Sequence, residues 1–190
     1  MKKLVLFLAA SACLLADAPN PDFYVSTFGG VNWLEQTLQS NVKTAYKTDA
    51  LGAISLGCKT GQGLCSRMEL EGSFRRNPLE YIRDKKRVKH EIKGLTETRS
   101  VFINTYYDFK VLSQMTIFLG IGSGYTFMKL DIAKNKIKAK DKKEGMSLQY
   151  IAGTKTPLSE HIDIGAEWRF FIARGDYREQ NIDLFLTYNF

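Results

Sequence analysis

Apolar and polar residues alternate along most of the chain, in runs of about ten residues. A period of two is typical of a β-strand that has one apolar and one polar face. The last run is NIDLFLTYNF, and five residues share its apolar face: Ile182, Leu184, Leu186, Tyr188 and Phe190. We predict eight such strands, at residues 23–34, 49–59, 65–76, 98–110, 115–130, 145–155, 161–174 and 181–190.

The connections between these predicted strands alternate between long and short. The long ones lie at 35–48, 77–97, 131–144 and 175–180, and the short ones lie at 60–64, 111–114 and 156–160. This alternation is typical of an up-and-down meander in which one end carries the variable loops. Because an even number of antiparallel strands can close without leaving an unpaired edge, we predict an all-β, eight-stranded antiparallel barrel.

The direction in which each face points separates two kinds of barrel. In the third predicted strand Met68, Leu70 and Phe74 lie opposite Arg67 and Glu69. A soluble barrel would turn the apolar face inward, whereas a transmembrane barrel has an apolar outer band and a polar interior. Aromatic residues cluster near the strand ends on the apolar faces, as they do at membrane interfaces. The pattern therefore favours a transmembrane barrel.

The polar faces carry both signs of charge within single strands. An Arg facing lipid at mid-depth would cost about 2 to 4 kcal/mol, and a buried charge needs a partner. We therefore expect an ion-paired network inside the barrel. Its predicted members are Arg67, Glu69, Glu71, Arg75, Asp108, Asp163, Glu167 and Arg169, with Gln149 beside them.

The first eighteen residues, MKKLVLFLAASACLLADA, have the build of a secretory signal peptide. Two lysines precede an apolar run that is too short to span a bilayer as a helix, and small residues follow. Cleavage after Ala12, Ala16 or Ala18 remains open, since Pro19 disfavours the last of these. A buried first helix and a lipoprotein anchored through Cys13 are the alternatives. We assign 1–18 to the signal peptide and 23–190 to the barrel domain.

Two cysteines, Cys58 and Cys65, flank the turn KTGQGL between the second and third predicted strands. In an oxidising compartment they can close this hairpin with a disulfide. A metal site is not expected, because the chain has only two histidines, His90 and His161, distant from these cysteines and from each other in sequence. Neither histidine has an evident Ser–acid partner, so we expect neither an enzyme nor a cofactor.

The formal net charge of +7 is concentrated in two segments. RDKKRVKHEIK (83–93) and KNKIKAKDKK (134–143) carry +4 and +5, so the rest of the chain sums to about −2. The second segment alternates lysines with other residues and can extend its two neighbouring strands. The basic candidates for contacts are Arg83, Lys85, Lys86, Arg87, Lys89, Lys134, Lys136, Lys138, Lys140, Lys142 and Lys143. They would attract anionic polymers rather than nucleic acid, since no aromatic stacking motif accompanies them.

The chain from Phe23 to Phe190 resembles the small eight-stranded outer-membrane β-barrels of the OmpA/OmpX type. The resemblance is carried by FYVSTFGGVNW, RMELEGSFRR, FINTYYDF, FLGIGSGYTF and IDIGAEWRFF, and most specifically by the ending with Tyr188 and a terminal Phe190. It implies that the last strand is read by the barrel-assembly machinery. It also implies that the short turns face the periplasm and that the long loops, beside lipopolysaccharide and outer-membrane lipid, face the exterior.

The resemblance and the charge pattern predict a monomeric structural and surface-interaction protein, with host anionic glycans as possible loop ligands. Two alternatives remain open: a narrow ion-conducting pore, and a secreted lipocalin-like barrel that binds a ligand inside. An RGD tripeptide at 174–176 also lies in a predicted outside loop, where Gly and Asp equally favour a simple turn.

Overall fold

A computed structural model describes residues 22–34, 37–39, 42–59, 66–83, 89–112, 114–134, 137–173 and 177–190. The predicted signal peptide at 1–18 lies outside these residues. Within the described ranges no helix is long and apolar enough to cross a membrane.

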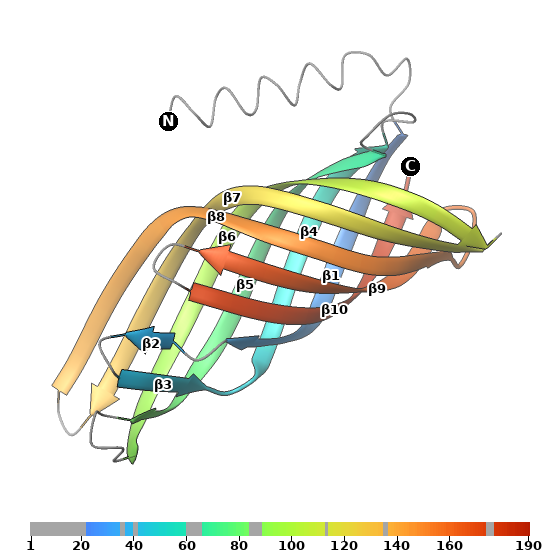
Figure 1. The fold of residues 1–190 in the computed structure, drawn as a ribbon. Coiled ribbons are helices and arrows are strands. Elements are labelled where there is room, and N and C mark those ends of the chain that lie inside the picture. The colour runs from blue at the N-terminus through green and yellow to red at the C-terminus, as the bar shows by residue number, and fades with distance from the viewer. Residues whose placement is uncertain are drawn as a thin grey trace.

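Eight long antiparallel strands form one closed barrel (Figure 1). They are β1 (Asp22–Leu34), β4 (Asp49–Lys59), β5 (Arg67–Arg83), β6 (Lys89–Leu112), β7 (Met115–Lys134), β8 (Ile137–Pro157), β9 (Ile162–Ala173) and β10 (Tyr177–Asn189). Each pairs with its neighbours in this order, and β1 pairs with β10. Two shorter strands, β2 (Thr37–Gln39) and β3 (Val42–Tyr46), form a hairpin whose β3 edge pairs with β5. The predicted up-and-down barrel is confirmed.

The seam between the first and last strands closes the barrel. Its register runs from Tyr24 opposite Asn189 to Leu34 opposite Glu179. Inside the seam the Ser26 and Thr187 hydroxyl oxygens lie 2.7 Å apart in a hydrogen bond. Through this seam every barrel strand has two partner strands, whereas the part of β8 before Ser147 pairs with β7 alone.

One wall of the barrel is much longer than the sequence pattern predicts. The connections expected at 77–97 and 131–144 are largely strand, because β5 runs to Arg83, β6 starts at Lys89, and the β7–β8 hairpin leaves only 135–136 between its strands. The expected connections at 35–48 and 175–180 likewise contain β2, β3 and the start of β10. Charged strands beyond the apolar band keep their ladder hydrogen bonds although they lose the alternation by which strands were predicted.

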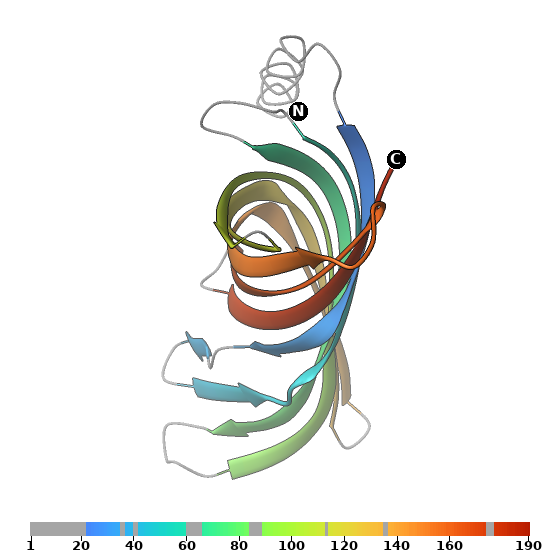
Figure 2. The same ribbon diagram turned by 90° about the vertical axis from the view of Figure 1, so that its right-hand side faces the viewer.

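The extended strands all project at the same end of the barrel, away from the C-terminus (Figures 1 and 2). We call this end, formed by the β5–β6, β7–β8 and β2–β3 hairpins, the hairpin end. The opposite end, which holds Asp22 and Phe190, is the terminus end. In both views the wall made by β5, β6, β7 and β8 reaches further than the wall made by β9, β10 and β1.

The two faces of the strands are inverted relative to a soluble barrel. Apolar side chains point outward and remain exposed, as for Leu184 at 68% and Leu56 at 61%. Polar and charged side chains point inward and are buried, and Arg75 and Arg169 have no exposed surface. Such an arrangement is stable only where the outer face meets lipid, because exposed apolar area of this extent is unfavourable in water.

The β1–β10 register predicts a specific cross-link. In a chain without Cys58 and Cys65, the pair S26C/T187C should form a disulfide spontaneously, since the two side chains face each other across the seam. After boiling without reductant, the cross-linked chain should migrate differently from its reduced form on a denaturing gel. Each single variant is the control. A double variant that stays reduced under mild oxidation contradicts the closed seam.

Candidate functional site

The interior of the barrel holds three layers of ion pairs along its axis. The layer nearest the terminus end is built on Arg67, at the start of β5. Its guanidinium lies 2.7 Å from Glu69 and 3.0 Å from Asp108, and Lys155 on β8 lies 2.7 Å from the other oxygen of Asp108. The Arg67 guanidinium also stacks 3.8 Å from the centre of the Tyr106 ring. Three strands, β5, β6 and β8, are thereby tied together.

The central layer surrounds Arg169, on β9. This guanidinium lies 2.7 Å from Glu71 and 3.3 Å from Asp183, and it also pairs with Glu167 on its own strand. Glu71 accepts further hydrogen bonds from the Asn104 amide at 2.7 Å and the Gln149 amide at 3.3 Å. All of these side chains are buried. One arginine therefore forms ion pairs with three carboxylates, on β5, β9 and β10.

The third layer lies toward the hairpin end and is centred on Glu179 of β10. Its carboxylate lies 3.4 Å from Arg75 and accepts hydrogen bonds from the Tyr177 hydroxyl at 2.7 Å and the Asn32 amide at 2.9 Å. Asn77 approaches the same carboxylate at 3.5 Å. Neutral donors thus supply most of the contacts of this buried acid.

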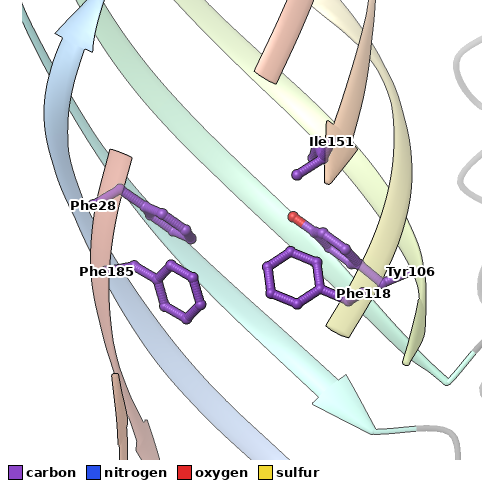
Figure 3. Packing of buried hydrophobic residues seen from close by; sticks show 5 residues of the cluster. All are labelled: Phe28, Tyr106, Phe118, Ile151 and Phe185. Atoms are coloured by element: carbon purple, nitrogen blue, oxygen red, sulfur yellow. The ribbon is translucent and has the colours of Figure 1, made fainter. Parts of the chain in front are cut away.

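Aromatic side chains fill the space between the ionic layers. Figure 3 shows Phe28 and Phe185 facing Tyr106 and Phe118 across the lumen, with Ile151 alongside. A second cluster nearer the hairpin end consists of Leu34, Phe102, Phe171, Ala173 and Tyr177. Most of the ring pairs meet edge to face, as do Phe118 and Phe185, which are centred 5.9 Å apart.

Two inward glycines make room for these rings. A Cβ added at Gly165 would lie 2.3 Å from the Phe185 ring, and one added at Gly57 would lie 2.2 Å from the Tyr24 ring. Both distances are far shorter than atomic contact allows. Each glycine is the register partner of its aromatic residue, so it lets the ring lie across the adjacent strand. The interior is filled by side chains, as expected for eight strands.

The structure places the predicted interior residues as follows. Arg67, Glu69, Glu71, Arg75, Gln149, Glu167 and Arg169 are buried in the lumen, and Asp108 is partly exposed within the layer at the terminus end. Asp163 lies at the rim, where its carboxylate accepts a hydrogen bond from Asn189 at 3.1 Å.

Sequence reasoning missed several members of these networks, among them two carboxylates and a lysine. Glu179 and Tyr177 fell in a segment expected to be a connection, and Lys155 was the last residue of its predicted strand. Asp183 lies on the polar face of the last predicted strand, a signal that could have identified it.

The other candidate residues lie outside the lumen. Ile182, Leu184, Leu186, Tyr188 and Phe190 are all exposed on the outward face, and their role as an assembly signal remains a prediction. Cys58 is buried in β4, whereas Cys65, and with it the predicted disulfide, lies outside the described residues. The RGD tripeptide at 174–176 also lies outside them. Among the described residues no cluster of three or more His, Cys, Asp or Glu side chains is arranged to hold a metal ion.

The basic segments lie at the hairpin end. Arg83 pairs with Lys89 across β5 and β6, whereas Lys85, Lys86 and Arg87 fall in the undescribed tip of this hairpin. In the β7–β8 ladder Lys134 pairs with Ile137, Lys138 with Ala133 and Lys140 with Asp131, and Lys136 falls in the undescribed tip. Lys142 and Lys143, lower on β8, are exposed.

A closed eight-stranded antiparallel barrel with an apolar outer face and an ion-paired interior defines a class, the small transmembrane β-barrels. The comparison with protein families agrees. Residues 4–190 match the family described as "Outer membrane protein beta-barrel domain", and the chain belongs to that family.

Solved structures share the fold at low sequence identity. Neisserial surface protein A superposes with a TM-score of 0.62 at 13% identity, covering 88% of this chain and 97% of that protein. Ail, the attachment invasion locus protein of Yersinia pestis, in complex with the heparin analogue sucrose octasulfate, gives 0.55 at 14% identity, covering 90% and 99%. The N-terminal β-barrel domain of Pseudomonas aeruginosa OprF gives 0.51 at 12%, covering 90% and 100%. A search of curated protein sequences found no match.

The central layer predicts a large cost for removing Arg169, which among the described residues is the one cation paired with Glu71, Glu167 and Asp183. R169M leaves the carboxylates of Glu71, Glu167 and Asp183 buried beside one another, so it should lower the free energy of unfolding by about 3 to 5 kcal/mol. Adding E167Q should recover part of this loss because it removes one of the three charges. Urea unfolding in detergent micelles, followed by the change in gel mobility on boiling, measures both effects.

The matched control is R178M, which removes an exposed arginine from β10 and should change stability by less than about 0.5 kcal/mol. If R169M is no more destabilising than R178M, the central ion-pair layer does not stabilise the barrel.

Proposed function

We propose that this protein is an integral barrel of the bacterial outer membrane whose hairpin end faces the exterior and attaches to anionic polymers. The observation that carries the proposal is the concentration of basic residues on strands that extend past the rest of the barrel. The β5–β6 and β7–β8 hairpins carry segments of +4 and +5, while the rest of the chain is slightly acidic. The positive electrostatic potential of these segments attracts polyanions over long distances.

The structural relative Ail was crystallised with a heparin analogue, sucrose octasulfate, and its name refers to attachment. At 14% identity this likeness concerns the fold, so the ligand is carried over here as a proposal that rests on the charge of the hairpins. Sulfated glycans combine dense negative charge with an extended shape, which suits a strand pair lined with lysines. The functional surface would then be the extended hairpins rather than the lumen.

We assign the lumen a structural role. Three ionic layers and two aromatic clusters occupy it along its axis, with side chains such as Phe102, Phe118 and Phe171 fully buried. The secreted lipocalin-like alternative conflicts with the outward apolar face, and the pore alternative conflicts with this filling. His161 is exposed at the terminus end, and its ring lies against Tyr188.

The attachment proposal predicts salt-dependent binding through the β7–β8 hairpin. K134Q/K136Q/K138Q/K140Q should weaken binding to immobilised heparin by about 1 to 4 kcal/mol, since each exposed ion pair is worth about 0.2 to 1 kcal/mol. The salt concentration needed for elution measures this. The control is K59Q/K110Q, which removes two lysines at the terminus end. Unchanged elution of the hairpin variant, in protein that still shifts its gel mobility on boiling, rejects the attachment proposal.

The structural role of the lumen predicts that the barrel does not conduct ions. Liposomes containing the refolded protein should hold a potassium gradient as well as protein-free liposomes, because buried side chains leave no continuous water path. A conductance that disappears on changing Arg67 or Glu69 would instead support the narrow pore.

A further inference from the structure

A row of charged residues crosses four strands on the outward face near the hairpin end. The register places Arg76 opposite Glu97, Glu97 opposite Lys129, and Lys129 opposite Lys142. The neighbouring outward row, one step closer to the middle of the barrel, consists of Phe74, Arg99, Phe127 and Glu144. Cationic and aromatic side chains therefore alternate within a small area of β5 to β8.

These rows enclose a groove of about 640 Å³. Its floor is β7, with Phe127 and Lys129, and its walls are Arg99 on β6 and Lys142 on β8. The remaining lining residues are Glu97 and Glu144 from the outward rows, and Met128 and Lys143 from the adjoining inward positions of β7 and β8. Four cations and two carboxylates thus line the groove, which leaves it positively charged.

Ion pairing and stacking hold two of these cations in place. The Lys129 ammonium lies 2.8 Å from Asp131, the next outward residue on β7. The Arg99 guanidinium lies over the Phe74 ring, 5.8 Å from its centre. A planar guanidinium held in this way can present its free edge to an oxyanion.

The groove borders directly on the lipid-facing band. One step further toward the middle of the barrel lie Tyr125 and Met146, and Met146 is 59% exposed. Phe127, on the floor itself, is 52% exposed. Cations immediately beyond an apolar and aromatic surface lie at the depth of lipid headgroups, where each is attracted to anionic lipid.

We propose that this groove binds the phosphate group of an anionic membrane lipid, with Arg99 and Lys142 on either side of the phosphate and the acyl chains along Phe127 and Tyr125. The proposal rests on the membrane placement proposed above, but not on attachment by the hairpins. Charge complementarity and continuity with the apolar band favour a lipid over a soluble anion. The acyl chains of a lipid can pack on the exposed aromatic surface, whereas a soluble anion has no apolar part to do so.

The test uses the full barrel refolded in uncharged maltoside micelles, titrated with diphosphoryl lipid A as the anionic probe. Bound ligand raises the temperature at which the folded band disappears from gels. R99Q and K142Q should each weaken the apparent affinity about fivefold, as expected for about 1 kcal/mol per basic residue near an anionic lipid surface. R99Q/K142Q should combine the two losses. The single variants keep the test valid if the double variant fails to fold.

The matched control is R178Q, which removes an exposed arginine from β10, on the opposite wall of the barrel. The proposal requires R178Q to retain the affinity of the parent. An equal loss in R178Q would show general attraction of the micelle surface and overturn the site. Unchanged affinity in R99Q and K142Q would overturn it as well.

Inorganic phosphate separates a lipid site from a site for free anions. Phosphate alone, at the same concentration of phosphate groups, should leave the unfolding temperature unchanged, and an equal increase would overturn the assignment to a lipid. The K134Q/K136Q/K138Q/K140Q variant should retain its response to lipid A. Loss of heparin binding in that variant and loss of lipid binding in R99Q/K142Q are therefore separate outcomes, so that either proposal can fail without the other.

Discussion

The structure depends on the requirement that every charge inside a narrow barrel has a partner. An eight-stranded barrel has an interior that side chains can just fill, so a buried charge cannot rely on bulk water. In the described part of the chain the interior ion pairs engage four cations, Arg67, Arg75, Lys155 and Arg169, and six carboxylates, Glu69, Glu71, Asp108, Glu167, Glu179 and Asp183. Because carboxylates outnumber cations, neutral donors supply further hydrogen bonds. Glu69 accepts hydrogen bonds from the hydroxyls of Tyr24 and Tyr106, and Glu179 accepts one from the hydroxyl of Tyr177.

This requirement also sets the position of the aromatic rings and the glycines. The long charged side chains of the ionic layers extend toward the barrel axis. Rings such as Phe118 and Phe185 fill the gaps between the layers. The Phe185 ring fits because its register partner on the adjacent strand, Gly165, has no side chain. Polar pairing and aromatic packing are thus two parts of one arrangement, which keeps water out of the interior that the lipid-facing band encloses.

The fold could be predicted from the sequence because lipid and lumen impose opposite demands on alternate residues. The strand around Arg67, Glu69 and Glu71 shows this alternation plainly, and its outward partners are apolar. The alternation stops where the chain leaves the membrane, so β5, β7 and β8 continued beyond their predicted ends. Glu179 was missed for the same reason. The convergence of Glu71, Glu167 and Asp183 on Arg169 could not be predicted, since it depends on the stagger of three strands rather than on any local pattern.

The same change of environment separates the two kinds of surface on this protein. Within the membrane each strand position is constrained on both sides, by lipid outside and by the packed lumen inside. Past the apolar outward band, the strands of the β5–β6 and β7–β8 hairpins keep their ladder pairings. Lys129 and Lys142 lie at this boundary, and the lysines of the β7–β8 hairpin lie past it. Residues on the extended hairpins and at their base can therefore vary without disturbing the buried ion pairs on which the barrel depends.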